Sequence, residues 1–361
     1  MTGDDPETTE KTTMTTQMPA PDHDARTISP AEQVMQLIGA PFLAQAVYCA
    51  TKLGVPDLLA DGPKSTEYLA VATSAHEHAL YRVLRALAMT GIFTETAPRT
   101  FANTPASDLL REDHPESAKY LTLWMNEPEH WKVYGQMIHS VKTGETAWEK
   151  VHGEPAFETL YETNRELGDI FNRAMTSFSH QTIPAIIEAY DFSSAGTIAD
   201  IAGGHGHLLA AILKANPGVK GVLFEIPYVL EGAPAMVESY GVADRVEYVA
   251  GDFTEAIPVT ADIYFMKHII HDWYDDKNAK ILGNIRANAP DNAKVLIIDT
   301  VIPEGNTEHF GKIMDLEMLV SPGGMERTPA EFGSLLARAG FKMTRIIETK
   351  SPVGIVEAVK A

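Results

Sequence analysis

The pattern of apolar and polar residues divides the chain into stretches of different character. Residues 1–27 have almost no large apolar side chains, so they cannot offset the entropy lost on ordering, and we predict a disordered tail there. Residues 28–190 carry apolar positions mostly at helical spacing. From residue 196 onward, short β-branched runs alternate with helical segments, which is typical of a parallel sheet with helices on both faces.

The segment 28–118 is predicted to resemble a winged helix. Ser29 and Pro30 suit the start of a helix that is apolar on more than one side, so this helix must be buried in a core or against a second subunit. An amphipathic helix at 79–93 and two short strands at 91–104 follow. A winged helix could belong to a DNA-binding regulator, but the segment is not basic, which favours a dimerisation or scaffold role.

Seven runs after residue 196 have the composition of strands. The last two are separated by only a few residues, which predicts an antiparallel hairpin that closes an otherwise parallel sheet. The fold class is therefore α/β, with a Rossmann-like sheet preceded by a helical, winged-helix-like domain. The runs are "TIADIA", "GVLFEI", "VEYVAGD", "ADIYFMK", "KVLIIDTVI", "MTRIIET" and "GIVEAVK".

Charge and composition exclude several classes of protein. The chain of 361 residues has a formal charge of −20, which repels phosphate backbones and anionic membranes, so neither nucleic acid nor membrane is expected as a partner. Cys49, the single cysteine, excludes an intrachain disulfide and is expected to be a small buried apolar residue. Since the sequence has no long uninterrupted apolar run and no secretory leader pattern, we expect a cytoplasmic protein.

A glycine-rich turn after the first predicted strand indicates a ligand site. Gly203, Gly204 and Gly206 stand between an apolar strand and a helix, where glycine permits a tight turn and a close approach of the backbone to a ligand. The N-terminus of the following helix offers free N–H groups. Turns of this kind bind NAD, FAD, nucleotides and S-adenosylmethionine alike, and a plain tight turn has the same composition.

Acidic residues near this turn favour the sulfonium cofactor. Glu225 ends the second strand, 22 residues after Gly203, where a carboxylate accepts hydrogen bonds from ribose hydroxyls. Asp252 ends the third predicted strand and suits an adenine amino group, with Phe253 against the ring. The turn reads G-G-x-G rather than G-x-G-x-x-G, and Asp200 just before it would repel a pyrophosphate. The same carboxylate suits the cationic methionine end of S-adenosylmethionine.

The run "FMKHIIHDWYDD" ends the fourth predicted strand with a cluster of polar side chains. His268 and His271 are three residues apart with acids nearby, which is a possible metal-ligand spacing. However, His268 is expected before the strand end, and Asp275 and Asp276 are expected to cap the next helix. We therefore predict no metal.

Several motifs, taken together and in order, resemble those of the caffeic acid type of S-adenosylmethionine-dependent O-methyltransferases. That group includes plant phenylpropanoid enzymes, acetylserotonin methyltransferase and many bacterial enzymes of secondary metabolism. The resemblance covers the chain from about residue 30 to the end, and the motif after the fourth strand and the "GGMERT" run are far more specific than the glycine turn. The motifs are Asp200 with "GGHG", Glu225, "GDF", "MKHIIHDW", "IIDTVIP" and "SPGGMERTPAEF".

The resemblance implies a domain organisation. A winged-helix-like dimerisation domain would occupy residues 28–118, and a methyltransferase domain would occupy residues 119–361. Helices in 119–190 would contribute to the substrate pocket. The protein would work as a homodimer through its N-terminal domain.

The resemblance also assigns chemical roles. His271 would be the general base that removes the proton of a substrate hydroxyl, and the oxyanion would then attack the sulfonium methyl group. An unperturbed imidazole titrates near pH 6.5, so a neutral base would be available at pH 7. Asp299 and Glu326 match the acidic pair that flanks this base, although the family often has the longer Glu at the first position. Lys267 and Trp273 match residues beside the adenine.

Other matched positions lie on helices. "FNRAMTSFS" resembles the helix that faces cofactor and substrate, which implies Ser179 at the cofactor and Phe171 and Met175 in the substrate pocket; core packing is the alternative for all three. "LWMNEPEHW" resembles a segment that contacts the substrate. It implies pocket roles for Trp124, Met125 and Asn126.

The predicted function is transfer of a methyl group from S-adenosylmethionine to a hydroxyl of a small aromatic metabolite, phenolic or quinone-like. One alternative is a relative on the same fold that methylates nitrogen or carbon, or does not methylate at all. Another is an NAD-type oxidoreductase. The sequence does not identify the acceptor.

Overall fold

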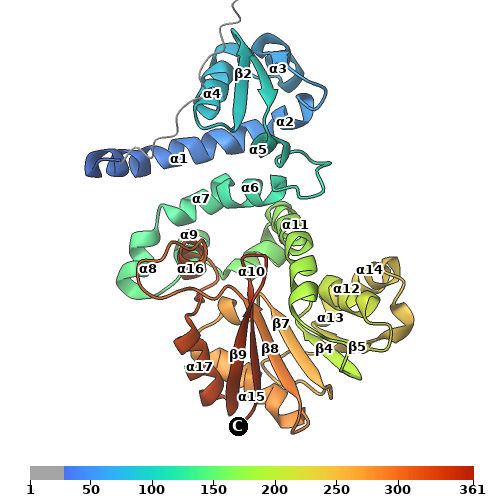
Figure 1. Ribbon diagram of the computed structural model, residues 1–361. Coiled ribbons are helices and arrows are strands. Elements are labelled where there is room, and N and C mark those ends of the chain that lie inside the picture. Colours follow the sequence, from blue (N-terminus) through green and yellow to red (C-terminus); the bar gives the residue numbers. More distant parts are fainter. Residues whose placement is uncertain (1–27) are drawn as a thin grey trace, which may run out of the picture. The chain divides into compact units, whose positions relative to one another are not determined.

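The computed structural model describes residues 28–361, apart from the side chains of residues 180 and 181 (Figure 1). The predicted tail at 1–27 lies outside the described residues. By compactness the chain divides after Leu43 into two units, and the larger one spans Ala44–Ala361. The predicted domain boundary at residue 118 stays a prediction.

The helix α1 (Pro30–Lys52) begins where the sequence predicts. The Glu32 N–H donates to Ser29 Oγ at 3.2 Å, and the Ser29 N–H donates to Glu32 Oε2 at 2.8 Å, so the two residues form a reciprocal cap. The helix exposes a row of large apolar side chains: Val34, Met35, Leu37, Ile38 and Phe42.

By length and composition alone, α1 could cross a membrane. The sequence does not suggest this, because it has no long uninterrupted apolar run. Length and composition are weak support for a membrane span, because a single apolar helix near an N-terminus satisfies the same criteria in many proteins without one. Cys49, expected to be buried, is exposed on the same helix.

The winged-helix arrangement is present in the part of the larger unit before residue 110. Leu80, Leu84 and Leu87 face its core from one side of α4, together with Phe93 and Phe101 from the strands. The predicted hairpin is confirmed, and a third short strand pairs with it in the order β1-β3-β2. The elements are α2 (Val55–Leu58), β1 (Lys64–Ser65), α3 (Thr66–Thr73), α4 (Glu77–Met89), β2 (Phe93–Ala97), β3 (Thr100–Asn103) and α5 (Pro105–Asp108).

Residues 119–190 are helical, as predicted. Buried aromatic residues join these helices, and the Trp148 indole N–H donates to Thr159 Oγ1 at 2.9 Å inside their core. The elements are α6 (Lys119–Asn126), α7 (Pro128–Tyr134), α8 (Met137–Thr143), α9 (Ala147–His152), α10 (Ala156–Glu158), the π-helical turn η1 (Thr159–Thr163) and α11 (Arg165–Ala189).

The predicted α/β sheet is confirmed, with all seven strands in the order β6-β5-β4-β7-β8-β10-β9. The final strand β10 lies between β8 and β9 and is antiparallel to both, so the predicted closing hairpin is present. The strands are β4 (Thr197–Ile201), β5 (Lys220–Glu225), β6 (Val246–Ala250), β7 (Ile263–Lys267), β8 (Lys294–Asp299), β9 (Phe341–Glu348) and β10 (Gly354–Lys360).

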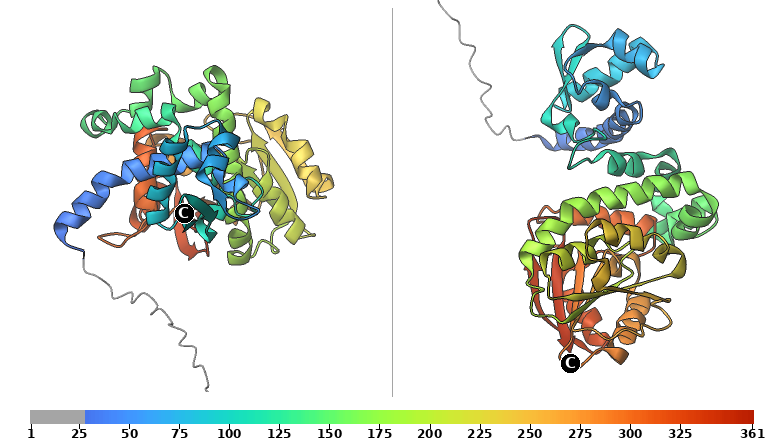
Figure 2. Two further views of the ribbon diagram at one scale, coloured as in Figure 1. Left: turned by 90° about the horizontal axis from the view of Figure 1, so that it is seen from above. Right: turned by 90° about the vertical axis from the view of Figure 1, so that its right-hand side faces the viewer.

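Helices cover both faces of this sheet (Figure 2). Ile198 and Ala199 are neighbours on β4 and belong to different core clusters, because successive strand residues point to opposite faces. The helices are α12 (His207–Ala215), α13 (Pro227–Leu230), α14 (Ala233–Ser239), α15 (Asp275–Asn288), α16 (Gly311–Val320) and α17 (Pro329–Arg338), with short 3-10 turns η2 (Ala243–Arg245) and η3 (Ile270–Asp272).

The strand order reverses at β4. From β4 the chain runs to β5 and β6 on one side and then crosses to β7 and β8 on the other. In open parallel sheets, ligands bind outside the carboxyl ends of the strands at such a reversal.

Candidate active site

Four strands bring polar residues to this one edge of the sheet. Asp200 lies near the end of β4, and Glu225, Lys267 and Asp299 are the last residues of β5, β7 and β8. These positions are far apart in sequence. Because parallel strands all end at the same edge, the topology alone collects them there.

The glycine turn lies directly against Asp200 and Glu225. A Cβ at Gly203 would collide with the Asp200 carboxyl group, so no side chain fits at that position. Gly204 and Gly206 have φ angles of 60° and 82°, which favour glycine. The Gly204 N–H donates to Glu225 Oε2 at 3.0 Å, and this bond fixes the turn to the end of β5.

Asp200 is buried, and the half-buried Lys267 is close enough to influence its ionisation. Burial raises the pKa of Asp200 to about 8, although Lys267 acts in the opposite direction. Burial likewise lowers the pKa of Lys267 to about 8, and its ammonium donates to Ser179 Oγ at 3.0 Å. Within residues 28–361, Asp200 Oδ2 has no hydrogen-bond partner. A buried carboxylate oxygen in this state would be stabilised by a cationic ligand.

The predicted adenine residues lie along the neighbouring part of the edge. Asp252 follows β6, and its Oδ1 accepts hydrogen bonds from the N–H and hydroxyl of Thr254, both at 2.7 Å, which lower the pKa of Asp252. Phe253 and Trp273 pack against the same core cluster. The Lys277 ammonium lies 3.0 Å from the centre of the Trp273 ring. The structure thus brings Phe253 and Trp273 to one core, and it adds a cation that the sequence analysis did not consider.

His271 lies in the turn η3, immediately after β7, with carboxylates on both sides of its ring. Its Nδ1 is 2.9 Å from Glu326 Oε1, and its Nε2 is 3.6 Å from Asp272 Oδ1. Burial lowers the pKa of His271, but the charges of Glu326, Asp299 and Asp272 outweigh burial and raise the pKa to about 10. Without bound ligands His271 is therefore protonated at pH 7. This differs from the expected neutral imidazole, because three carboxylates meet at one ring.

Asp299 reaches this cluster in a different way from Glu326. Its Oδ1 accepts the backbone N–H of His268 at 2.8 Å, and no described hydrogen bond joins it to the His271 ring. His268 has a φ angle of 56°, in the left-handed region. Asp299 therefore holds the strained backbone just before η3, as the shorter side chain allows, and acts on His271 through its charge.

The run "GGMERT" holds the turn that carries His271. A Cβ at Gly324 would collide with the backbone of His271 and Asp272, and the Met325 N–H donates to the His271 carbonyl at 2.9 Å. Arg327 is buried in the same contact, and its guanidinium donates to the carbonyls of Ile270 and Trp273, both at 3.0 Å. The motif is recognisable in the sequence, but this role of Arg327 is not.

Asp275 and Asp276 do not cap α15 as predicted. The residue before the helix is Tyr274, which makes no side-chain cap, and the two acids lie in the first helical turn. Asp275 Oδ1 instead pairs with Arg327 at 2.7 Å, and Asp276 pairs with Arg338. Asp275 pairs with the buried Arg327 instead of capping the helix.

A metal-ligand geometry is also present at the base. One possible ligand atom from each of His268, His271 and Asp299 lies within 4.8 Å of the others. Burial, together with the charges of Lys267 and His271, holds the pKa of His268 well below its usual value, so this imidazole stays neutral. A metal here would occupy a ring nitrogen of His271, the predicted general base. That the site holds no metal stays a prediction.

The predicted pocket residues meet in an aromatic cluster. The rings of Trp124 and Phe171 are 5.0 Å apart in an edge-to-face contact, and Met125 and Met175 pack in the same cluster. Phe157, which the sequence analysis missed, lies 6.0 Å from Trp273 and 6.5 Å from Phe171. It links the aromatic cluster to the turn that carries His271.

Asn126 is not directed into this cluster by any described contact. The side-chain amide of Asn126 donates to the Thr122 carbonyl at 3.0 Å within the same helix. The backbone carbonyl of Asn126 accepts a hydrogen bond from the Gln45 side chain at 3.1 Å. These bonds favour a structural role for Asn126 over contact with a substrate.

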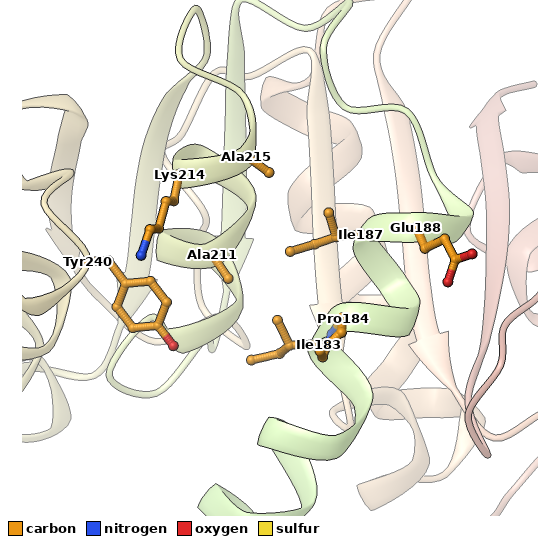
Figure 3. A pocket seen from close by; sticks show the side chains of 8 residues that line it. All are labelled: Ile183, Pro184, Ile187, Glu188, Ala211, Lys214, Ala215 and Tyr240. Carbon is orange, nitrogen blue, oxygen red and sulfur yellow. The ribbon is translucent and has the colours of Figure 1, made fainter. Parts of the chain in front are cut away.

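A groove of about 690 Å³ lies outside the site, between the C-terminal half of α11 and α12 (Figure 3). Ile183, Ile187 and Ala211 give it an apolar wall, and Lys214 and Tyr240 lie at its side. None of the predicted site residues lines it.

The chain is similar to known methyltransferases over most of its length. Residues 131–342 match the model of an O-methyltransferase domain, and residues 35–113 match the model of an O-methyltransferase dimerisation domain. A phenazine O-methyltransferase of Lysobacter antibioticus is 41% identical over 325 residues, which cover 90% of this chain and 95% of that protein.

Two further relatives bear on the cofactor and the acceptor. An 8-amino-8-demethylriboflavin N,N-dimethyltransferase of Streptomyces davaonensis is 38% identical, over 88% of this chain and 90% of that protein. The solved structure of CalO1, a methyltransferase in calicheamicin biosynthesis in its SAH-bound form, has a TM-score of 0.82 and 32% identity, and the match covers 92% of this chain and 98% of that chain. Similar proteins thus include both oxygen-directed and nitrogen-directed enzymes.

Proposed function

Since the chain belongs to the O-methyltransferase family with an N-terminal dimerisation domain, and so is a methyltransferase that uses S-adenosylmethionine, we propose that it methylates a hydroxyl of a small aromatic metabolite. His271 is the general base in this proposal. The observation that carries it is the pairing of His271 Nδ1 with Glu326 at 2.9 Å, beside the carboxyl end of β7.

The residues at the edge of the sheet fit the cofactor. When bound, S-adenosylmethionine supplies an electrophilic methyl group on a sulfonium ion. Asp200, with its unpaired buried oxygen, would bind the cationic end of the cofactor. Glu225 would accept hydrogen bonds from the ribose hydroxyls, beside the turn at Gly203, Gly204 and Gly206. The adenine would lie among the remaining predicted residues, which are Ser179, Asp252, Phe253, Lys267 and Trp273.

The carboxylates around His271 suit a phenolic acceptor. A phenol titrates near pH 10, so an ordinary imidazole, at about 6.5, would be a poor acceptor for its proton. Once neutral, an imidazole whose pKa is raised to about 10 takes that proton without a large energetic penalty, although at pH 7 the free protein holds His271 mostly protonated. Nδ1 faces Glu326, so Nε2 takes the proton, and Glu326 stabilises the imidazolium that results.

The cationic cofactor itself adjusts this base. A positive charge close to His271 disfavours the imidazolium and lowers the pKa of His271 from its value in the free protein. Cofactor binding therefore increases the neutral fraction of His271, which is the form that accepts the proton. The base and the methyl donor would thus be ready together.

The acceptor is proposed to be a flat aromatic molecule. Trp124, Phe171, Met125 and Met175 gather in one cluster, and Phe157 connects this cluster to Trp273. Aromatic and methionine side chains suit a planar apolar ring. The named activity of the Lysobacter relative, on a phenazine, agrees with this class of acceptor.

Nitrogen-directed transfer is the second candidate, because a relative with 38% identity is an N,N-dimethyltransferase. An arylamine nitrogen attacks through its lone pair and needs no strong base beforehand. The His271 arrangement therefore favours oxygen. The match to the O-methyltransferase models leaves an NAD-type oxidoreductase without support.

We also propose that the protein is a homodimer and works in the cytoplasm, as the sequence predicts. The dimerisation-domain match at residues 35–113 and the exposed apolar side chains of α1 support the dimer. Such a row of side chains is costly to leave in water.

Paired acceptors test the choice of atom. The protein would be incubated with S-adenosylmethionine carrying a deuterated methyl group and with pairs of aromatic compounds that differ only in a hydroxyl or an amino group. We expect labelled product from the hydroxyl member of a pair, located by mass spectrometry. Label on the amino member alone would replace the proposal with the nitrogen-directed candidate.

A further inference from the structure

A second buried histidine–carboxylate pair lies outside the cluster at His271. His130 on α7 is fully buried, and its Nε2 is 2.8 Å from Oε1 of Glu317 on α16, which is only 5% exposed. The other ring nitrogen, Nδ1, is 3.0 Å from the carbonyl oxygen of Trp124. The Tyr134 hydroxyl donates to Glu317 Oε2 at 2.8 Å.

The partners fix where the hydrogens of this pair lie. A carbonyl oxygen only accepts, so His130 Nδ1 carries a hydrogen and donates it to Trp124. His130 Nε2 lies 2.8 Å from Glu317 Oε1 without a described hydrogen bond, so we regard it as a close polar contact.

The helix α16 connects this pair to the proposed base. Asp315, two residues before Glu317, accepts the backbone N–H of Glu326 on its Oδ1 at 2.8 Å. Glu326 is the residue whose carboxylate meets His271 Nδ1 at 2.9 Å. Residues two apart on a helix point to different sides, so α16 is held by polar contacts from two directions.

The contacts therefore form a continuous path from the aromatic cluster to the base. It runs from the Trp124 carbonyl through His130 and Glu317 into α16, and from Asp315 through Glu326 to His271. A buried ion pair adds little stability on average compared with apolar side chains of the same volume. A role in placing α16 accounts better for a buried histidine–carboxylate pair here than stability does.

We infer that His130 and Glu317 are positioning residues that fix α16, and through Asp315 fix the Glu326 carboxylate that orients His271. The inference rests on the proposed function in that it takes His271 as the base. It extends that function by coupling the wall of the acceptor pocket to the geometry of the base.

The experiment reads His271 directly, without acceptor or turnover. The protein is labelled with ¹³C at histidine Cε1, and His271 is titrated by NMR, its signal being identified by its loss in His271→Ala. Glu317→Gln keeps the shape of the side chain but removes its charge, and Asp315→Ala removes the contact with Glu326. The double variant completes a thermodynamic cycle.

We expect each single substitution to shift the titration of His271 to lower pH, because Glu326 is then less well placed beside the ring. In the double variant Glu317→Gln should add nothing further, since the link through Asp315 is already broken. Additive shifts would show a direct effect of charge and overturn the inference, as would a His271 titration that Glu317→Gln leaves unchanged.

Two further variants separate positioning from folding. His130→Asn keeps a donor for the Trp124 carbonyl but loses the contact with Glu317, and Tyr134→Phe removes only one hydrogen bond to the same carboxylate. With a hydroxyl acceptor, His130→Asn should lower kcat about tenfold and leave cofactor affinity unchanged. An unfolding temperature lowered without a change in kcat or in the His271 titration would mean a merely structural pair.

The two proposals can fail independently. If no hydroxyl acceptor is methylated but the titration cycle is non-additive, the coupling stands and the proposed function falls. If methylation occurs and the cycle is additive, the proposed function stands and the coupling falls.

Discussion

At the scale of single residues, the environment of one imidazole decides the proposed chemistry. Glu326, Asp272 and Asp299 surround His271 and outweigh the effect of its burial on the pKa. In its neutral form this histidine is a stronger base than an isolated one, but a smaller fraction of it is neutral at pH 7. Because its pKa is raised, His271 is protonated at neutral pH in the free protein, and the activity is therefore expected to depend on pH.

Replacing Glu326 by Gln should separate these two effects. The substitution removes the charge that raises the pKa of His271, so the pKa falls and the rise of kcat with pH moves to lower pH. The maximal rate should drop about 100-fold, because the imidazolium loses its stabilising partner. Rates measured from pH 6 to 10 test this, and a rise that stays at the same pH would contradict the assigned role of Glu326.

Asp200 should couple cofactor binding to pH. Burial raises its pKa to about 8, so it is largely protonated in the free protein at pH 7, and a cationic ligand favours the ionised form. Binding therefore releases a proton and tightens as pH rises towards 8, and the nearby Lys267 acts in the same direction. Calorimetry at two pH values, in buffers of different ionisation enthalpy, measures this proton.

Asp200→Asn provides the control for that experiment. The amide cannot ionise, so binding should weaken and lose the part of its pH dependence that comes from Asp200, while the part from Lys267 remains. An affinity of the wild type that is constant between pH 6.5 and 8.5 would remove Asp200 from the cofactor site.

At the scale of elements, the turn η3 is held in place by a segment far along the chain. Gly324 packs against the backbone of His271 and Asp272, and Arg327 donates to carbonyls on both sides of the turn. The His271 motif and the "GGMERT" motif therefore act as one unit. Their joint presence in the sequence reflects this contact.

Gly324→Ala should disturb that unit. The added methyl group has no room beside the His271 carbonyl, so we expect a loss of about 1–3 kcal/mol in stability together with most of the activity. Gly283→Ala is the matched control, because that glycine lies within α15, with nothing within 4 Å of an added Cβ, and alanine there should stabilise by about 0.5–1 kcal/mol. Thermal unfolding and activity that match the wild type in Gly324→Ala would contradict the close contact.

The elements were largely predictable from the sequence, whereas their long-range contacts were not. The strands follow from local period and composition, and Leu80, Leu84 and Leu87 face one core as their spacing predicts. The pair of His130 and Glu317 joins residues far apart in the chain, and no local sequence pattern predicts this contact. The raised pKa of His271 has the same origin, because it depends on three carboxylates brought together only by the fold.

At the scale of the whole molecule, the exposed apolar side chains of α1 indicate a partner surface. Phe42 is 78% exposed and Leu37 is 75% exposed, within a segment that matches a dimerisation domain. Phe42→Glu should place a charge in that interface and shift the protein towards the monomer. Light scattering or sedimentation measures the mass, and Glu32→Gln, at the start of the same helix, is the control; an unchanged dimer in Phe42→Glu would place the interface elsewhere.

The central claim is that His271 assists methyl transfer to a hydroxyl, and a single-turnover comparison tests it most directly. Wild type and His271→Gln would be loaded with labelled S-adenosylmethionine, their cofactor affinities measured, and the transfer to the best hydroxyl acceptor followed by mass spectrometry. We expect His271→Gln to bind the cofactor at least as tightly as the wild type, because the positive charge of His271 is gone, and to transfer the methyl group at a rate lower by about 10²–10⁴. Equal transfer rates in the two proteins would contradict the claim and leave proximity of the bound reactants as the source of catalysis.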